Sequence, residues 1–141
     1  MTNDGRALPI LHLDSDNADD MQQLGPYRIN TLIKESEEGA GTVYRVHIEP
    51  NQTTNTSYHR IAEEYYFILS GNGTAFLDGE PYPLKTGDFL RLPPGTKHSF
   101  RSGDNGLEML DIHTPGCRPN RDTYFVDETP SGFSPPKETD L

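Results

Sequence analysis

The alternation of apolar and polar side chains along the chain predicts a series of short β-strands. From Tyr27 to Ile33 and from Thr42 to Ile48, β-branched and aromatic residues alternate with polar ones, and the segment 35–41 between them has turn composition. These two runs are typical of paired strands. No segment of the chain has a helical period, so the pattern favours an all-β fold.

The middle of the chain continues this pattern. Tyr65 to Leu69 is a continuous apolar run, which we expect to end in a hairpin turn at Gly71-Asn72-Gly73, and Asp78-Gly79 is a type I′ hairpin signal. Further strands are expected at Thr74 to Leu77, Phe89 to Leu92, His98 to Arg101 and Leu107 to His113. About eight short strands at near-regular spacing predict a single-domain β-barrel or jelly roll.

The ends of the chain differ in composition from this central part. Residues 1–26 contain the apolar run Leu8 to Leu13 and an acidic stretch, and we expect them to form an edge strand and a loop. Residues 27–126 are expected to form the barrel domain. Residues 127–141 are rich in Pro, Ser and charge, which predicts a flexible C-terminal tail.

Charge and cysteine content exclude several classes of partner. The net charge of -10 opposes binding to nucleic acid, because phosphate backbones attract Lys and Arg. The single cysteine, Cys117, cannot form an intramolecular disulfide, which suits a reducing compartment. Neither a signal peptide nor a membrane span is recognisable. We therefore expect a cytoplasmic protein without a membrane partner.

Three side chains with metal affinity fall near the ends of expected strands. His59 and Glu64 flank a short turn, and His98 follows the turn Pro93-Pro94-Gly95. Two imidazoles and one carboxylate are suitable ligands for a divalent transition metal such as Fe, Mn, Ni, Co or Zn. A lone histidine on a strand is more often hydrogen-bonded than metal-bound, so these residue types alone leave both interpretations open.

The residues around this set resemble the two sequence motifs of the cupin superfamily. The first motif reads Gly, five residues, His-x-His, three or four residues, Glu, six residues, Gly, and the spacing of His59, Glu64 and Gly71 fits it. The second reads Gly, five residues, Pro-x-Gly, two residues, His, three residues, Asn. The segment from Gly87 to His98 matches it fully up to the final Asn, where Ser102 stands.

The first motif departs from the family pattern at two positions. Asn51 replaces the opening Gly, and Ser57 replaces the first histidine. The resemblance implies a cupin-type barrel, or double-stranded β-helix, with a metal site in its mouth. With Ser57 in place of a histidine, the four ligands that the motifs would provide are reduced to His59, Glu64 and His98.

Strand alternation adds candidate pocket residues to the ligand set. Tyr66 and Ile68 share the parity of Glu64, and Phe100 shares that of His98, so all three are expected to point inward, either as pocket wall or as plain barrel core. The other pocket candidates are Ser57, Met109 and His113.

Three further residues, outside the two motifs, have side chains that could take part in the site. His113 or His47 could complete the ligand set, but the sequence favours a surface or turn position for His113 and a structural role for His47. Cys117 has no evident activating base nearby in the sequence and is expected to be an ordinary thiol.

Three functions remain open. The first is a metalloenzyme in which His59, Glu64 and His98 hold the metal for oxygenase, lyase or isomerase chemistry. The second is a non-catalytic cupin that binds a small molecule. The third is a metal-free isomerase or epimerase, in which an imidazole is the general base and Tyr66 the acid. The family resemblance and the sheet edges of a small barrel also imply a homodimer.

Overall fold

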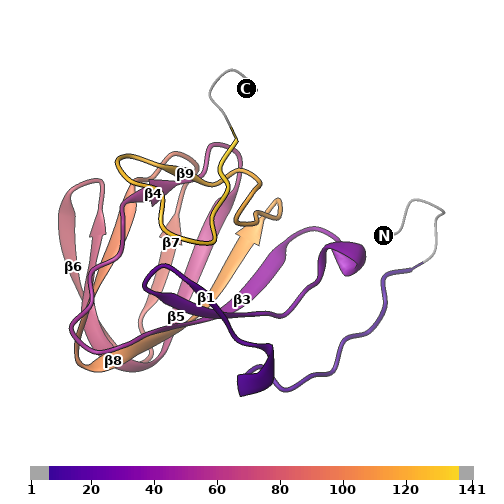
Figure 1. The fold of residues 1–141 in the computed structure, drawn as a ribbon, viewed down its shortest axis with the longest axis horizontal. Coiled ribbons are helices and arrows are strands. Elements are labelled where there is room, and N and C mark those ends of the chain that lie inside the picture. The colour runs from indigo at the N-terminus through magenta and orange to yellow at the C-terminus, as the bar shows by residue number, and fades with distance from the viewer. Residues whose placement is uncertain (1–6, 137–141) are drawn as a thin grey trace.

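Two long antiparallel strands, β5 (Glu63–Leu77) and β8 (His98–Thr114), form the centre of the fold (Figure 1). This is seen in a computed structural model that describes residues 7–136. The remaining strands are β1 (Gln22–Leu24), β2 (Tyr27–Thr31), β3 (Thr42–Ile48), β4 (Ser57–Tyr58), β6 (Glu80–Lys85), β7 (Phe89–Leu92) and β9 (Tyr124–Phe125). Within this described part, the helices are two 3-10 turns, η1 (Ala18–Asp20) and η2 (Glu35–Glu37).

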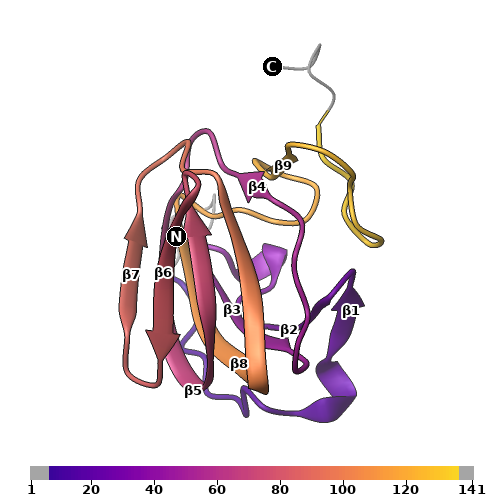
Figure 2. The same cartoon turned by 90° about the vertical axis from the view of Figure 1, so that its left-hand side faces the viewer.

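The nine strands belong to one curled sheet. One path runs β1-β2-β3-β8-β4-β9, and β5 pairs with β6, β7 and β8 away from that path. Figure 2, turned by 90°, shows β5, β6 and β7 on one side of the molecule and β1, β2 and β3 on the other. The all-β barrel expected from the sequence is therefore confirmed.

The central strands bend strongly along their length. A straight 15-residue strand is about 50 Å long, yet Glu64 near the start of β5 contacts His98, whose cross-strand partner Leu77 ends β5. The bend occurs at register shifts between residues 68 and 73. There Gly71 has a φ of +85°, and a Cβ on it would lie 2.1 Å from the carbonyl oxygen of Gly106. Only glycine fits this approach of two backbones.

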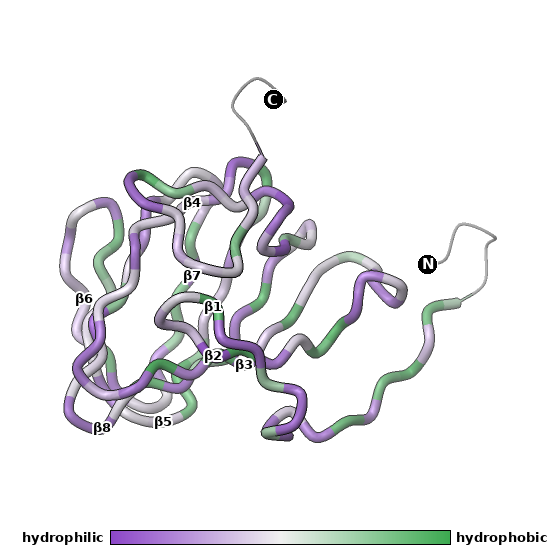
Figure 3. Tube along the Cα trace, viewed as in Figure 1, coloured by the Kyte–Doolittle hydropathy of each residue, from purple (hydrophilic) through white to green (hydrophobic). Residues whose placement is uncertain are grey.

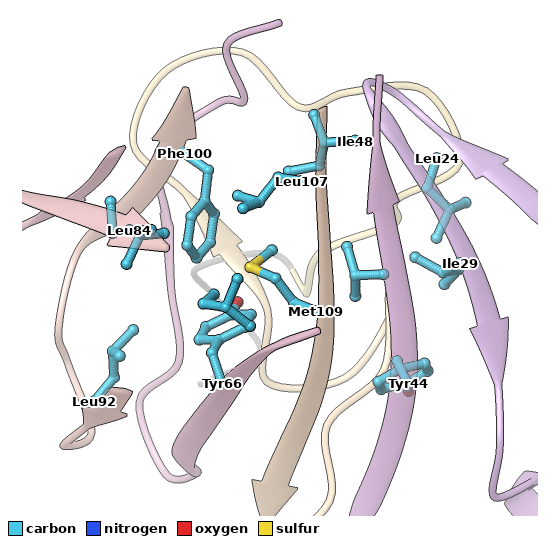
Figure 4. Close-up of a cluster of buried hydrophobic side chains, with 13 residues drawn as sticks. Leu24, Ile29, Tyr44, Ile48, Tyr66, Leu84, Leu92, Phe100, Leu107 and Met109 are labelled. Carbon is cyan, nitrogen blue, oxygen red and sulfur yellow. The ribbon is translucent and has the colours of Figure 1, made fainter. Parts of the chain in front are cut away.

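Alternation along the strands builds the core. Every second residue of β3, beginning with Thr42 and ending with Ile48, is buried, and the side chains between them are partly exposed. Figure 4 shows Tyr66, Phe100, Leu107 and Met109 pointing toward one another inside the barrel. This packing closes the lower part of the barrel and leaves one end for a site.

Three local expectations have different outcomes. The hairpin at Asp78-Gly79 is confirmed, since both residues have positive φ, at 50° and 85°. The hairpin expected at residues 71–73 is wrong, because these residues form an irregularity within the continuous strand β5. Residues 1–26 do contribute an edge strand, but it is β1 (Gln22–Leu24), at one end of the strand order, while the apolar run at residues 8–13 is an extended arm with no strand assignment. Ile10 on this arm is 98% exposed, and Figure 3 shows the arm leading away from the barrel.

The segment after β9 returns to the open end of the barrel. Phe133 packs edge-on against Tyr27 and against Phe125, with ring centroids 6.3 and 4.9 Å apart. Part of the stretch expected as a tail therefore contacts the barrel, while its last residues, 137–141, lie outside the described residues, as do residues 1–6 of the N-terminal stretch. Between residues 7 and 136, no helix has the length and apolar character needed to cross a membrane.

Candidate functional site

His59, Glu64 and His98 come together in the barrel interior. The Nε2 atoms of His59 and His98 each lie 3.2 Å from Oε1 of Glu64, and all three side chains are buried. Their ligand atoms lie within 4.8 Å of one another, close enough to bind a single ion. The motif spacing thus predicted a set of side chains that the fold brings together.

Different elements position the three side chains. Ser57 of β4 is the cross-strand partner of His98, the first residue of β8, so the short β4 brings the chain beside that histidine. His59 follows β4 directly, and Glu64 lies at the start of β5, on its buried face. Ser57 is buried with its Oγ 3.4 Å from Nε2 of His98. A histidine side chain at residue 57 would therefore point toward the same centre.

Main-chain carbonyls hold the outer nitrogens of both imidazoles. Nδ1 of His59 lies 2.7 Å from the carbonyl oxygen of Asp122, and Nδ1 of His98 lies 3.0 Å from that of Thr96. A carbonyl oxygen only accepts hydrogen bonds, so each neutral ring carries its proton on Nδ1 and turns the lone pair of Nε2 toward Glu64. This second layer of contacts is typical of metal-binding histidines.

His113 belongs to the same cluster, and the surface or turn position expected for it is wrong. It is 4% exposed, and its Nε2 lies 2.7 Å from Oε2 of Glu64. Asp111 is also buried, with Oδ1 3.7 Å from the same nitrogen. The alternation of buried residues along β8 carries both side chains inward, because they share the parity of Leu107 and Met109. That parity was the available signal for His113 and for Asp111, which the sequence analysis missed.

Cys117 is not the ordinary thiol that the sequence suggested. Its Sγ lies 3.2 Å from Nδ1 of His59 and 3.3 Å from Oγ1 of Thr123. Burial raises the pKa of this thiol, but hydrogen bonds with His113 and His59 outweigh that effect and lower the pKa to about 7. Two imidazoles can activate Cys117. His113 is four residues away in the sequence, but His59 is more than fifty residues away, and only the fold brings both close to the thiol.

One buried carboxylate faces three imidazoles, which shifts the pKa values of all four groups. Burial opposes the charged form of Glu64, but the three histidines hold the pKa of its carboxyl well below the usual range. Burial also opposes the charge on His59 and His113, yet nearby acidic groups raise both pKa values, that of His59 to about 11. The pKa of His98 is lowered, because burial and two neighbouring imidazoles outweigh Glu64. A single carboxylate cannot stabilise three imidazolium ions.

Asp111 responds in the opposite direction to Glu64. Burial and the negative charge of Glu64 raise the pKa of the Asp111 carboxyl well above its ordinary value. Its Oδ1 has no hydrogen-bond partner among the described residues, and the same holds for Oε1 of Glu64. Nε2 of His113 lies 2.7 Å from Oε2 of Glu64, but the two atoms are not aligned as a hydrogen bond. Buried polar atoms of this kind require a partner, so the centre has the donors and acceptors to hold a cation or a polar group of a ligand.

A cavity leads from this centre to the open end of the barrel. Besides the cluster, its lining includes Ser57, Tyr66, Tyr27, Tyr44, Arg118, Phe125 and Phe133. Ile68, Phe100 and Met109 point inward as expected, but each is fully buried in the core below the cavity and none lines it. Burial raises the pKa of Tyr66 well above its ordinary value, so its hydroxyl remains a donor at neutral pH.

The remaining candidate, His47, lies away from the cluster. Its parity on β3 is opposite to that of the buried Tyr44 and Val46, so it faces the outside of the sheet. There its Nε2 is 3.6 Å from Glu49. Of the two histidines considered as a fourth ligand, His113 is the one that contacts Glu64.

Comparison with known proteins agrees with the fold and the motifs. A family model described as "Cupin domain" matches residues 44–113, which include every histidine of the cluster. Protein SchB of Streptomyces halstedii is 30% identical over 80 residues, and quercetin 2,3-dioxygenase of Bacillus subtilis is 36% identical over 59 residues. These matches cover 57% and 42% of this chain but only 58% and 18% of the two relatives, so the chain spans less than two thirds of either protein.

The fold is also similar to solved structures. The Y89F variant of Streptomyces Pac13, solved with uridine, superposes with a TM-score of 0.68 at 18% identity, covering 85% of this chain and 94% of the other. Another Pac13 structure is described as that of a nucleoside dehydratase. Identity at this level establishes a common fold, while the substrates belong to those proteins. With its barrel topology, its second motif and the matching domain model, this chain belongs to the cupin superfamily.

Proposed function

We propose that this cupin binds one divalent transition metal through His59, Glu64 and His98 and acts as a small-molecule metalloenzyme. The observation that carries the proposal is the pair of carbonyl contacts at Nδ1 of the two histidines, 2.7 and 3.0 Å long. In the neutral form of each ring, these contacts leave the Nε2 lone pair facing one carboxylate oxygen at 3.2 Å. Without a metal, a proton on His59, whose pKa is raised, offsets the charge of this carboxylate. A divalent cation can replace that proton and be bound by all three atoms at once, so the arrangement favours a metal ion.

The donor set fits the metals expected from the sequence. Two imidazole nitrogens and one carboxylate oxygen suit Fe, Mn, Ni, Co or Zn and leave coordination positions open. A bound metal of this kind supplies either activation of oxygen or polarisation of a substrate oxygen, as oxygenase, lyase and isomerase reactions require. With Ser57 in place of a histidine, the side that faces the cavity is left open for a substrate.

Other residues of the cluster support such a reaction. His113 contacts the second oxygen of Glu64, which holds the carboxylate so that Oε1 faces His59 and His98. The raised pKa of the Asp111 carboxyl favours its protonated form, which can donate a hydrogen bond to a bound ligand. The hydroxyl of Tyr66 is a second buried donor in the cavity lining.

The cavity lining favours a small, largely apolar substrate with at least one oxygen group. Aliphatic and aromatic side chains, among them Leu24, Ile29, Tyr44 and Phe125, form most of the wall. Most of the polar side chains in the lining belong to the cluster around Glu64 and Asp111, with Arg118 as the exception among the charged ones. A ligand that presents its oxygen to the metal and its apolar body to the wall matches this division.

Elemental analysis tests the proposal directly. Protein purified without an affinity tag or added metal should contain close to one equivalent of a transition metal, and the double variant His59→Ala, His98→Ala should lose it. The variant His47→Ala is the matched control, because it removes an imidazole outside the cavity. If the wild type remained metal-free after incubation with excess iron, nickel or zinc, a binding module or a metal-free isomerase with Tyr66 as acid would replace this proposal.

We also propose that the chain forms a homodimer. Exposed apolar side chains include Phe67 and Phe89, cross-strand partners on β5 and β7, and Ile10 on the N-terminal arm. Covering such side chains in a second copy would remove apolar surface from water. Light scattering coupled to gel filtration should give twice the monomer mass of 15.8 kDa, and the monomer mass would overturn the proposal.

A further inference from the structure

A single buried carboxylate holds the bend between two of the proposed metal ligands. His59 and Glu64 are separated by an irregular segment whose three successive N–H groups all point to the side chain of Asp122. The shortest contact of each is 2.8 Å for Arg60, 3.1 Å for Ile61 and 2.8 Å for Ala62. A carboxylate that accepts several main-chain N–H groups makes strong, charge-assisted hydrogen bonds.

The main chain of Asp122 contacts the same segment. Its carbonyl oxygen is the acceptor for Nδ1 of His59, at 2.7 Å. The residue has a φ of +55° and is 7% exposed. Asp is among the few residue types that adopt positive φ at low cost, so this residue can turn its carbonyl and its carboxylate toward one segment.

The loop that carries Asp122 is itself anchored. Arg118 and Arg121 exchange two main-chain hydrogen bonds, of 3.0 and 2.9 Å, and Oγ1 of Thr123 donates to the carbonyl of Arg118 over 2.8 Å. The guanidinium groups of both arginines contact the carboxylate of Glu38. Asp122 is therefore held on both sides, by residues before and after it.

We propose that Asp122 is a positioning residue of the metal centre. Its carboxylate fixes the spacing between His59 and Glu64, and its carbonyl fixes the tautomer of His59 that leaves Nε2 free for a metal. Only the role at the metal ligand His59 rests on the proposed metal centre, because the contacts between the Asp122 carboxylate and residues 60–62 exist without a metal. Residues in this position contribute by orienting a ligand, and their loss typically weakens metal binding by about 10- to 100-fold.

The test compares two substitutions at Asp122 with one control. Asp122→Gly removes the carboxylate and still adopts positive φ without strain. Asp122→Asn keeps one acceptor oxygen and also tolerates positive φ. Asp88→Gly is the control, because it removes a carboxylate that accepts the N–H of Lys85 over 3.0 Å at a turn away from the cavity.

Two measurements separate the parts of the proposal. Hydrogen–deuterium exchange of the metal-free protein reports the protection of the amides of residues 60–62, and competition with a chelating dye gives the dissociation constant for Zn²⁺. Asp122→Gly should speed exchange of these three amides at least about tenfold and weaken Zn²⁺ binding by about 10- to 100-fold. The visible spectrum of bound Co²⁺ should also change. Asp122→Asn keeps an acceptor for Arg60 but places an amide N–H2 donor against the N–H of Ala62, so it should restore each property only in part.

Each contrary result has a defined meaning. Unchanged amide exchange in Asp122→Gly would overturn the role of the carboxylate in the bend, and an unchanged Zn²⁺ dissociation constant would overturn its role at the metal centre. Equal effects in Asp88→Gly would also overturn the inference, because the loss would then be general. If the wild type bound neither Zn²⁺ nor Co²⁺, the proposed function would fail, while the exchange data would still decide whether Asp122 holds the bend.

Discussion

Glu64 and His113 are cross-strand partners on β5 and β8, and their side chains meet with Nε2 2.7 Å from Oε2. This contact uses the carboxylate oxygen that does not face His59 and His98. One residue of β8 therefore sets the orientation of the proposed carboxylate ligand from the opposite side. The relationship arises from strand register rather than from either sequence motif.

The first prediction concerns this contact. His113→Ala removes the group that holds Oε2 of Glu64, so the carboxylate can rotate, and the Zn²⁺ dissociation constant should rise by about 10- to 100-fold. Competition titration with a chelating dye measures the change. His47→Ala, which removes a partly exposed histidine on β3, should leave the constant unchanged. Equal affinity in His113→Ala and the wild type would show that His113 neither binds the metal nor orients its ligand.

The second prediction restores the missing residue of the first motif. Ser57 is buried beside His98, and a histidine there would direct an additional imidazole toward the centre. Ser57→His should tighten Zn²⁺ binding by about tenfold, equal to about 1.4 kcal/mol. Ser57→Ala should bind Zn²⁺ as the wild type does, because a neutral hydroxyl is a poor ligand. Weaker binding in Ser57→Ala would instead identify the hydroxyl as part of the centre.

Sequence patterns predicted the parts of this structure that depend on local signals. The alternation from Thr42 to Ile48 and the run from Phe89 to Leu92 coincide with β3 and β7. The hairpin at Asp78-Gly79 is likewise a local property of two residues. The sequence also identified the proposed ligand set, because the first motif fixes the spacing of His59 and Glu64 and the second fixes the position of His98.

The features that sequence reasoning missed depend on long-range pairing. Gly71 has the composition of a turn, but its role is to let β5 approach the backbone at Gly106, thirty-five residues away. Cys117 and Asp122 reach His59 only because the loop after β8 folds back over β4. No sequence motif fixes the separation between His59 and either residue, so neither could be connected with the site before the fold was known.

The third prediction concerns the thiol of Cys117. The pKa of this thiol in the metal-free protein is lowered from its ordinary value of 9.0 to about 7, so about half of the thiol is ionised near neutral pH. Absorbance at 240 nm should therefore titrate with a midpoint near pH 7, and this step should be absent in Cys117→Ser. A midpoint at or above 9 would mean that His59 and His113 do not stabilise the thiolate.

The same shift predicts a stability difference. The folded protein releases the thiol proton at lower pH than the unfolded chain, so the contribution to stability is present above pH 9 and is lost as pH falls through 7. Two pKa units correspond to at most about 3 kcal/mol. Urea unfolding of metal-free wild type and Cys117→Ser at pH 6 and pH 9 should give a difference between the two proteins that grows with pH.

The fourth prediction concerns Glu38, which anchors the loop that carries Cys117 and Asp122. Its carboxylate contacts the guanidinium groups of Arg118 and Arg121, and Arg118 is 9% exposed. Burial opposes the charge on Glu38, but the two arginines outweigh it and lower the pKa of this carboxyl. Glu38→Gln leaves the buried guanidinium of Arg118 without its charged partner, so stability at pH 7 should fall by about 1.5–3 kcal/mol.

The pH dependence of this effect has a definite sign. Because the pKa of Glu38 in the folded protein lies below its ordinary value of 4.5, this carboxylate contributes its stability above that pH, and the contribution is lost as pH falls through the folded pKa. Urea unfolding should therefore separate wild type and Glu38→Gln at pH 7, and the two curves should converge toward pH 3. Glu37→Gln, at a partly exposed position of the same 3-10 turn, is the control and should match the wild type at both pH values. A difference that persisted unchanged at pH 3 would mean that Glu38 acts through its shape, since protonated Glu and Gln are both neutral and similar in size.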